Sequence, residues 1–376
     1  MVKVIKKINL NKWKPLRNKY SPKYNVELRA NDITILTDQA LQVMIKTALE
    51  PEWEAIFQKY CYKLKKEQSY HDVIQCIYNL YNAQSIKNWI VKLNIQRGFD
   101  CISKDFMTKL FHSFPAKRII QSWLNTGGGD FPRVKTQDTK FNRSLCMCLA
   151  NIILYDLQKE IRISNNKREK IKDKNIIIHY KNEFIVACQT EEDALKIREV
   201  LNRGLHSRGL FTDNIKIQHI TQGFNFLGFN IQLHNHSKYG KQKLTIKPSK
   251  ESVLKIKNKL KKMWMKSNGS PVAKIIKKIN PIIRKWAHYF KIGNSSKIFK
   301  LLDHFMYRRQ WRFTRKQHSK KARKWIQQRY WRLLCLGHKN KWVFGCKETG
   351  AYMLKFLWIK NQRHLKKIYN FTGLFS

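Results

Sequence analysis

The chain has 376 residues, of which 43% are apolar, and a formal net charge of +51. This length and apolar content support two or three hydrophobic cores and exclude a chain that is disordered throughout. The last 136 residues hold 37 Lys and Arg against three acids, a net charge of +34, whereas the first 240 hold 39 against 22, a net +17. Charge of one sign repels itself unless a polyanion neutralises it, which indicates a nucleic-acid partner.

Cysteine spacing and hydropathy exclude other classes. The eight Cys include no Cys-x-x-Cys pair, which argues against a zinc ribbon or a nuclease with a cysteine-bound metal. No run reaches the roughly 18 apolar residues that a membrane span requires, and the N-terminus lacks a secretory core. Lys outnumbers Arg 56 to 20, as A+T-rich coding sequence produces. We therefore expect synthesis in an organelle, most simply a plastid, with a bacterial cytoplasm as the second choice.

The first 240 residues predict a mixture of helices and strands. Apolar residues recur at helical spacing over four stretches, residues 38–60, 70–80, 106–123 and 144–158. A strand is predicted at Trp89–Ile95, and Asn175–Tyr180 with Phe184–Cys188 predict a hairpin whose polar tip is Lys181-Asn182-Glu183. A helix is predicted over Glu191–Leu205 and strands over Phe224–Leu233.

The pattern changes near residue 240. Val253, Ile256, Leu260 and Trp264 follow helical spacing with Lys between them, and the spacing resumes from Ile275. A helix start is predicted at Asn280–Pro281, because proline is favoured at the first helical position. Seven of the eleven Trp lie after residue 240 and supply flat faces that stack on bases or pack a core. The sequence thus predicts an α+β region followed by a basic helical one.

Several short blocks occur together in one order. The most specific are Gln222-Gly-Phe-Asn-Phe-Leu-Gly-Phe229, Asn280-Pro-Ile-Ile-Arg-Lys-Trp-Ala-His-Tyr-Phe290 and Arg308-Arg-Gln-Trp-Arg312, preceded by Ser69-Tyr-His-Asp72 and Leu149-Ala-Asn-Ile152. In this order they resemble the reverse-transcriptase-derived maturases of group II introns. The resemblance implies a reduced right-hand polymerase fold with fingers and palm over residues 1–240. A thumb-like, all-helical maturase domain X would occupy residues 241–350, and a tail 351–376.

The resemblance also implies a function. A maturase binds a group II or group II-derived intron in its precursor transcript and stabilises the active fold of that RNA. The RNA and its own Mg²⁺ perform the chemistry, so no catalytic residue, metal site or cofactor is expected on the protein. Other splicing factors are expected as further partners, and no membrane is expected.

The expected polymerase site departs from the family pattern. Two Mg²⁺ ions require carboxylates from two palm segments, because hard cations prefer anionic oxygens. The resemblance places these ligands at Asn94 and Asn182, which offer neutral oxygens, and Lys181 adds a cation beside the second. The remaining acids are Asp100 and Glu183. We therefore predict a scaffold without polymerase activity.

The basic residues of the maturase-like region are the candidate RNA ligands. They are Arg284, Lys285, Arg308, Arg309, Arg312, Arg315, Lys316, His318, Lys320, Lys321, Lys324 and Arg329. The candidate base-stacking residues are Trp286, Tyr289, Trp311 and Trp325. For the cations the alternative is a solvated helical face, and for the aromatic residues it is packing in a core. His318 fits either a phosphate contact or a helix cap.

Two other functions stay open on the sequence. One is an active RNA-dependent DNA polymerase of an intron, in which Asp100 and Glu183 would hold the metal ions. The other is a general RNA chaperone that binds many transcripts. The target intron and the oligomeric state are not encoded in any motif.

Overall fold

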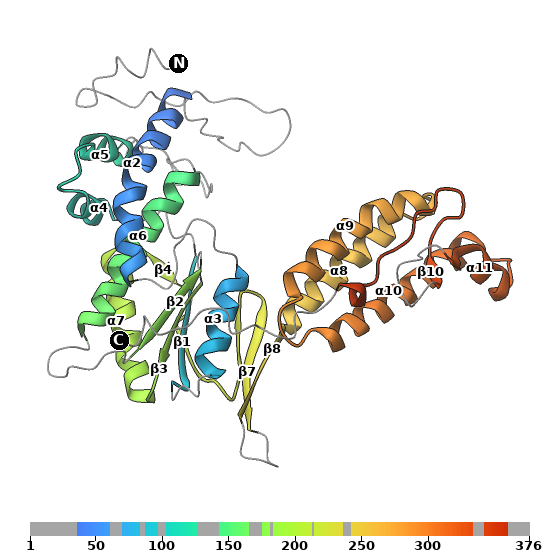
Figure 1. Ribbon diagram of the computed structural model, residues 1–376. Helices are drawn as coiled ribbons and strands as arrows, with labels where there is room; N and C mark the ends of the chain where they lie inside the picture. The colour runs from blue at the N-terminus through green and yellow to red at the C-terminus, as the bar shows by residue number, and fades with distance from the viewer. Residues whose placement is uncertain are drawn as a thin grey trace. The chain divides into compact units, whose positions relative to one another are not determined.

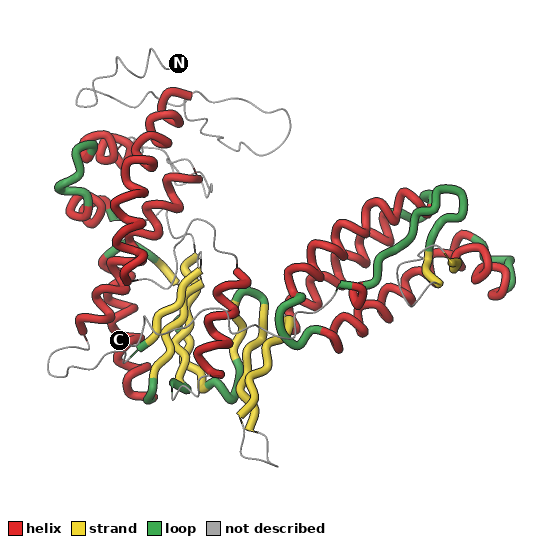
Figure 2. The backbone as a smooth tube through the Cα atoms, in the orientation of Figure 1, coloured by secondary structure: helices red, strands yellow, loops and turns green. Residues whose placement is uncertain are grey.

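The computed structural model describes residues 36–60, 70–82, 87–96, 103–125, 143–164, 175–180, 183–212, 214–235, 242–333 and 342–359. These residues form two compact units (Figures 1 and 2). The first unit comprises the chain up to residue 73 together with 86–219. The second comprises residues 74–85 and the chain from residue 220 onward. Among the described residues, no helix is long and apolar enough to cross a membrane.

An antiparallel sheet lies at the centre of the first unit. Strand β1 (Trp89–Gln96) pairs on one side with β3 (Glu183–Cys188), which forms a hairpin with β2 (Ile176–Tyr180). On its other side β1 pairs with β5 (Lys216–His219) and, near its end, with β4 (Phe211–Thr212). The strands are rich in β-branched residues, which suit a pleated, buried surface. The predicted strand and hairpin are confirmed.

Helices cover one face of this sheet (Figure 1). They are α2 (Leu36–Tyr60), α6 (Arg143–Ser164) and α7 (Glu191–Ser207), and their apolar faces share one core with alternate residues of the strands, such as Val91, Phe184 and Val186. Helix α7 begins where the Thr190 hydroxyl accepts a hydrogen bond from the Asp193 N–H, and three acids fill its first turn. Both features stabilise a helix N-terminus.

The helical stretch predicted over residues 106–123 is two helices. Helix α4 (Lys104–Leu110) ends at Phe111, and α5 (Lys117–Asn125) begins after a turn that contains Pro115. Proline cannot donate a backbone hydrogen bond and disfavours helical geometry in the residue before it. The continuous apolar spacing concealed this break.

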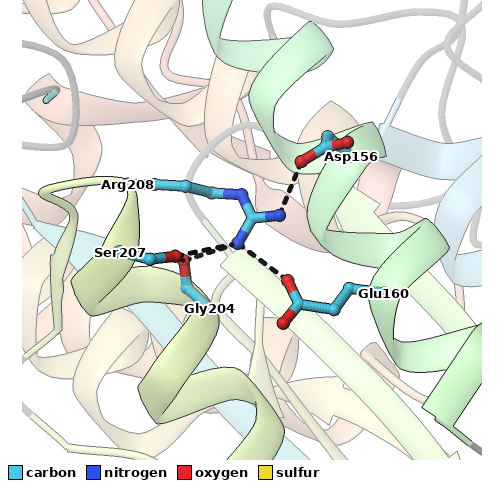
Figure 3. Close-up of polar contacts among 5 residues, drawn as sticks. All are labelled: Asp156, Glu160, Gly204, Ser207 and Arg208. Carbon is cyan, nitrogen blue, oxygen red and sulfur yellow. Dashed lines mark hydrogen bonds and ion pairs between the residues drawn. The ribbon is translucent and has the colours of Figure 1, made fainter. Parts of the chain in front are cut away.

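A buried arginine joins three helices of the first unit, and Figure 3 shows its polar contacts with α6 and the end of α7. Arg208, which follows α7, places Nη2 2.6 Å from Asp156 Oδ2 and Nη1 2.9 Å from Glu160 Oε2, both on α6. Nη1 also donates to the Gly204 carbonyl oxygen at 2.7 Å, and the guanidinium lies 4.9 Å from the ring centre of Phe106 on α4. One side chain thus carries charge-assisted bonds and a cation–π contact that fix α4, α6 and α7 together.

The second unit begins with a three-stranded antiparallel sheet, β6 (Phe224–Phe226), β7 (Phe229–Asn235) and β8 (Gln242–Pro248). The Leu227–Gly228 turn between β6 and β7 takes the left-handed conformation, with φ of 49° and 77°. Two helices hold its carbonyl oxygens: Ser252 Oγ donates to Gly228 at 2.9 Å and Tyr289 Oη to Leu227 at 3.0 Å. The Phe-Leu-Gly-Phe block is therefore a turn that anchors the helices which follow it.

Helices make up most of the remaining second unit. They are α8 (Lys250–Lys266), α9 (Val272–Phe290), α10 (Ser296–Gln317) and α11 (Arg323–Tyr330), and residues 74–82 of α3 (Tyr70–Asn82) also belong to this unit. Buried side chains such as Trp264, Ile283, Phe299 and Phe313 form their shared interior. The structure adds a two-stranded ribbon to the predicted helices, β9 (Trp331–Leu333) with β10 (Trp342–Phe344).

Helix α9 runs through Pro281, so the predicted helix start at Asn280–Pro281 is wrong. The buried positions Ile276, Ile279 and Ile283 continue on both sides of the proline, and Pro281 itself faces solvent. Burial of this apolar stripe outweighs the loss of one helical hydrogen bond.

Residues 351–358, here called the strap, pack against α9 and α10 and end in the short 3₁₀ helix η1 (Phe356–Trp358). Asn280 on α9 donates to the Tyr352 carbonyl at 2.8 Å and accepts from the Leu354 N–H at 3.0 Å. Asp303 on α10 accepts from the N–H groups of Phe356 and Leu357 at 2.7 and 3.1 Å.

The sequence predicted domain boundaries near residues 240 and 350. The second compact unit takes in both the β6–β8 sheet and the strap.

Candidate nucleic-acid interface

Helix α10 separates an apolar face from a cationic one. Phe299, Leu302, Met306 and Phe313 are buried at helical spacing. The opposite side exposes four predicted RNA ligands, Arg308, Arg312, Arg315 and Lys316. Arg309 is half-buried, with its guanidinium 5.3 Å from the ring centre of Phe305. The core-forming spacing of α10 therefore fixes the direction in which the arginines point.

The turn between α10 and α11 presents the next cations. His318 Nε2 lies 2.6 Å from the Tyr330 hydroxyl, which donates to Gln317 Oε1 at 3.3 Å. Gln317 in turn donates to the Ser270 carbonyl at 3.2 Å and so ties the turn to the α8–α9 loop. These bonds hold a compact turn on which Lys320 and Lys321 are exposed, and α11, which follows it, exposes Lys324 and Arg329. The geometry gives His318 an organising role in this turn.

Acidic side chains do not compensate these charges. The last 136 residues contain only Glu251, Asp303 and Glu348. Glu251 pairs with Lys255 on α8, and Asp303 is bonded to the strap. In the part of the chain that the structure describes, the exposed cations of α10 and α11 have no carboxylate partner. Burial, together with the charges of Arg312 and Arg308, lowers the pKa of Arg309, as expected where cations crowd.

The four predicted stacking residues differ in how free their rings are. Trp286 packs among Phe290, Phe299 and Phe356, with ring centres 4.4 to 6.0 Å apart. Tyr289 bonds the Leu227 carbonyl and lies against Phe229. Trp311 is stacked on Trp331 at 4.7 Å.

Trp325 differs from these three. It is half-buried, with His318 at its edge and the cationic groups of Lys321 and Arg329 5.6 and 5.4 Å from its ring centre. The geometry therefore favours packing roles for Trp286, Tyr289 and Trp311, and it places Trp325 among the exposed cations.

In the first unit, the structure brings two of the four predicted polymerase positions together. Asn94 on β1 is the direct register partner of Glu183 on β3, so both side chains lie on one face of the sheet. Lys92, two residues earlier on that face, places Nζ 3.7 Å from Glu183 Oε2. Asp100 and Asn182 lie outside the described residues.

Asn94, Lys92 and Glu183 do not by themselves supply the ligands of a two-metal polymerase site. Such a site needs several anionic oxygens within reach of both ions, whereas here the one described carboxylate faces a neutral amide and an ammonium group. A second cation, Lys216 on β5, is the register partner of Lys92. Across the described residues, no three His, Cys, Asp or Glu side chains gather in a way that could hold a metal ion.

Known protein families match both the polymerase-like region and the basic helical region. Residues 22–231 match the reverse transcriptase (RNA-dependent DNA polymerase) family, and residues 253–331 match the maturase-specific domain of group II introns. The chain belongs to the reverse-transcriptase-derived maturases of group II introns. The predicted family and the mixed α/β polymerase-like fold are confirmed. In this maturase, every candidate RNA ligand falls within the matched maturase-specific segment.

Two curated relatives resemble this maturase at moderate identity. Maturase-like protein 1 of Euglena gracilis is 28% identical over 296 residues, which cover 76% of this chain and 59% of that protein. The chain thus spans less than two thirds of the length of that relative. Protein YkfC of Escherichia coli is 24% identical over 267 residues, which cover 61% of this chain and 70% of that protein.

Among solved structures, similar chains include two telomerases. One is from Candida albicans in complex with a fragment of telomeric RNA, with 10% identity and a TM-score of 0.42 over 73% of this chain and 50% of that one. The other is the apo telomerase of Candida tropicalis, with 13% identity and a TM-score of 0.40 over 59% of this chain and 49% of that one.

The maturase-specific helices expose more cations than the sequence argument selected. Alongside Arg284 and Lys285, α9 exposes Lys274, Lys277 and Lys278, and α8 exposes Lys259, Lys261, Lys262 and Lys266. All occupy positions between the buried residues of their helices, so the helical period could have identified them. The predicted ligands cluster where the local density of charge is highest, on α10, α11 and the turn between them, with only Arg284 and Lys285 on α9.

Proposed function

We propose that this maturase binds a group II or group II-derived intron within its precursor transcript and stabilises the splicing-active fold of that RNA. The observation that carries the proposal is the uncompensated cationic surface of α10, α11 and the turn between them, inside the matched maturase-specific segment. The intron RNA would perform the transesterification with its own Mg²⁺, and no cofactor would be held by the protein.

The physical role is that of counter-charge on a fixed shape. A folded RNA crowds its phosphates, and a preformed basic surface relieves their repulsion while condensed counterions are released. If about eight phosphates are neutralised, affinity should fall by about 10³- to 10⁵-fold between 50 and 200 mM salt. The α10 core residues fix the backbone from which the arginines project, so the binding step needs no ordering of the main chain there.

The proposal is tested by removing four charges at once. The variant Arg312→Ala, Arg315→Ala, Lys316→Ala, Lys320→Ala should bind the intron-containing transcript weakly, and its salt slope should fall by about four. The matched control removes four exposed cations from α6 and α7 of the first unit, Lys159, Lys196, Arg198 and Arg203. It has the same net charge but should bind nearly as the unmodified protein does.

Filter retention of labelled transcript over a salt series measures both quantities. Equal retention of the two variants would contradict the proposal, because only the position of the lost charges distinguishes them. Equal binding of unrelated transcripts by the unmodified protein would favour the general RNA chaperone instead.

We further propose that the palm serves as a scaffold without polymerase activity. Support comes from the Lys92–Glu183 ion pair and from Asn94 at the expected ligand position. Primer extension with Mg²⁺ or Mn²⁺ provides the test, and measurable nucleotide incorporation would favour the active polymerase. We propose an organelle, most simply a plastid, as the compartment, because the excess of Lys over Arg is what A+T-rich coding sequence produces.

A further inference from the structure

One tryptophan of the second unit remains open to solvent. The side chain of Trp342 on β10 is 60% exposed, whereas Trp264 and Trp331 are buried and Trp286, Trp311 and Trp325 are half-buried. An exposed tryptophan ring offers a flat apolar face on which a ligand can stack. Trp342 is not among the base-stacking residues predicted from the sequence.

Trp342 lies on the same face as a row of packed rings. On β10 it is two residues from Phe344, and residues two apart in a strand share a face. Phe344 is the register partner of Trp331 on β9, with ring centres 5.3 Å apart. Trp331 then stacks on Trp311 of α10 at 4.7 Å and an interplanar angle of 22°. The ribbon thus extends an aromatic row from α10 to Trp342.

The other end of this row is also exposed. Tyr307 on α10 is 42% exposed, and its ring centre lies 5.9 Å from Trp331 and 6.2 Å from Trp311. We call Tyr307, Trp311, Trp331, Phe344 and Trp342 the aromatic ledge. Its inner rings are packed and fix the ledge, while Tyr307 and Trp342 offer open surface at its two ends.

Cations border the ledge. The guanidinium of Arg323 on α11 lies 5.1 Å from the ring centre of Trp311. Arg315 is exposed one helical turn beyond Trp311, and positions four apart lie on the same helix face. Aromatic platforms beside cations are the arrangement by which proteins hold single-stranded nucleic acid, since bases stack on rings while the backbone follows the positive charge.

We propose that the aromatic ledge binds unpaired RNA bases by stacking on Trp342 and Tyr307. The inference rests on the proposed function and adds to it the kind of RNA structure recognised. In a duplex the base faces are covered by neighbouring pairs, so the ledge selects a loop, bulge or single-stranded junction. The cations of α10, α11 and the turn between them would meanwhile contact phosphates in paired and unpaired RNA alike.

An RNA is favoured over a protein partner by the surrounding charge. The ledge lies in a region of the chain with a net charge of +34 and is bordered by Arg315 and Arg323. A protein docking surface of comparable apolar area would need an unusually acidic partner to offset that potential.

The test compares two labelled RNAs that share one stem. The first is a stem–loop with an unpaired uridine loop, and the second closes the loop into a continuous blunt duplex. Trp342→Leu and Tyr307→Leu should each bind the stem–loop about 10-fold more weakly and the duplex as the unmodified protein does. Trp342→Phe should recover most of the lost affinity, because it restores an aromatic face.

Salt dependence and a matched apolar control complete the experiment. The leucine variants should keep the salt slope of the unmodified protein, since they remove no charge. Met44→Ala on α2 removes a side chain of 49% exposure from the first unit and should change neither RNA. Because Trp342 is largely exposed, thermal unfolding of its variants should match that of the unmodified protein.

The outcomes separate the two proposals. If the unmodified protein binds neither these RNAs nor the intron-containing transcript, the proposed function fails and the ledge fails with it. If it binds the intron-containing transcript but neither of these RNAs, only the ledge is overturned. If it binds both with strong salt dependence and the leucine variants bind the stem–loop equally well, only the ledge is overturned. Equal losses on stem–loop and duplex, without recovery by Trp342→Phe, also overturn the ledge. Loss of splicing in vivo with unchanged stem–loop binding would assign the surface to a protein partner.

Discussion

Arg208 provides a sharp test of how the first unit is held together. Its side chain is 5% exposed, whereas the carboxylates of its partners Asp156 and Glu160 are 34% and 45% exposed. The two sides of the cluster therefore differ in what happens when a partner is lost. Without the arginine, both carboxylates can regain water. Without the carboxylates, the guanidinium stays buried and charged, because arginine cannot deprotonate in proteins.

Because of this asymmetry, the two substitutions should destabilise the first unit by different amounts. Arg208→Met keeps the apolar stem against Phe106 and lets the acids rehydrate, so we expect a loss of about 1–2 kcal/mol. The double variant Asp156→Asn, Glu160→Gln leaves a cation without a counter-charge, and we expect a loss of about 3–5 kcal/mol. The double variant should also loosen the end of α7, where Arg208 bonds the Gly204 carbonyl.

Hydrogen exchange of the α6 and α7 amides is the suitable assay, because it reports the opening of these helices separately from the second unit. Peptides of α8 and α10 serve as internal references. Lys255→Gln, which breaks an exposed ion pair on α8, is the matched control and should change exchange by less than about 0.5 kcal/mol. A smaller loss in the acid double variant than in Arg208→Met would refute the argument from burial.

Three further predictions concern pH and backbone conformation. Burial lowers the pKa of His179 from 6.5 to about 4, so the folded first unit holds it neutral and should lose about 3 kcal/mol as pH falls from 6.5 to 4, a loss that His179→Gln should abolish. Burial raises the pKa of Asp303 from 3.8 to about 6 despite the strap N–H groups. The stability that the protonated carboxyl contributes to the second unit should therefore be lost as pH rises from 4 to 6. Asp303→Asn should flatten that change. Exchange rates corrected for intrinsic pH dependence distinguish the two units. Gly293→Ala should destabilise α9 and α10 by about 2–4 kcal/mol in thermal unfolding, because φ is 89° and a Cβ would overlap the Ile246 carbonyl oxygen. Gly269 has a φ of 78° but open space around it, so Gly269→Ala should cost about 1–2 kcal/mol.

The sequence predicted the elements whose pattern is local. The β2–β3 hairpin, β1, α6 and α7 all follow from alternation or helical spacing of apolar residues, and the structure confirms them. Helix α9 could not be predicted whole, because the choice between a helix start and an interior proline at Pro281 depends on the core that α9 buries. The β9–β10 ribbon has three residues in each strand, too few for a distinctive pattern.

The candidate site was predictable in its charge and not in its aromatic surface. Arg308, Arg312 and Arg315 are exposed as their helical spacing indicates. Trp331 and Trp342 look alike in sequence, since each begins a short run of strand-forming residues. Trp331 is nevertheless buried and Trp342 is exposed to solvent. Only the strand register and the position of α10 decide which ring is covered. The Lys92–Glu183 pair depends in the same way on the β1–β3 register.

The strap is held in a manner that leaves its own amino acids largely unconstrained. Asn280 and Asp303 bond only main-chain groups of residues 352, 354, 356 and 357. Any residue at 352, and any residue other than proline at 354 or 357, leaves those bonds intact, whereas Met353 and Phe356 fill the interior. In distant relatives this segment should therefore diverge freely apart from two apolar anchors, while the amide and the carboxylate that hold it persist.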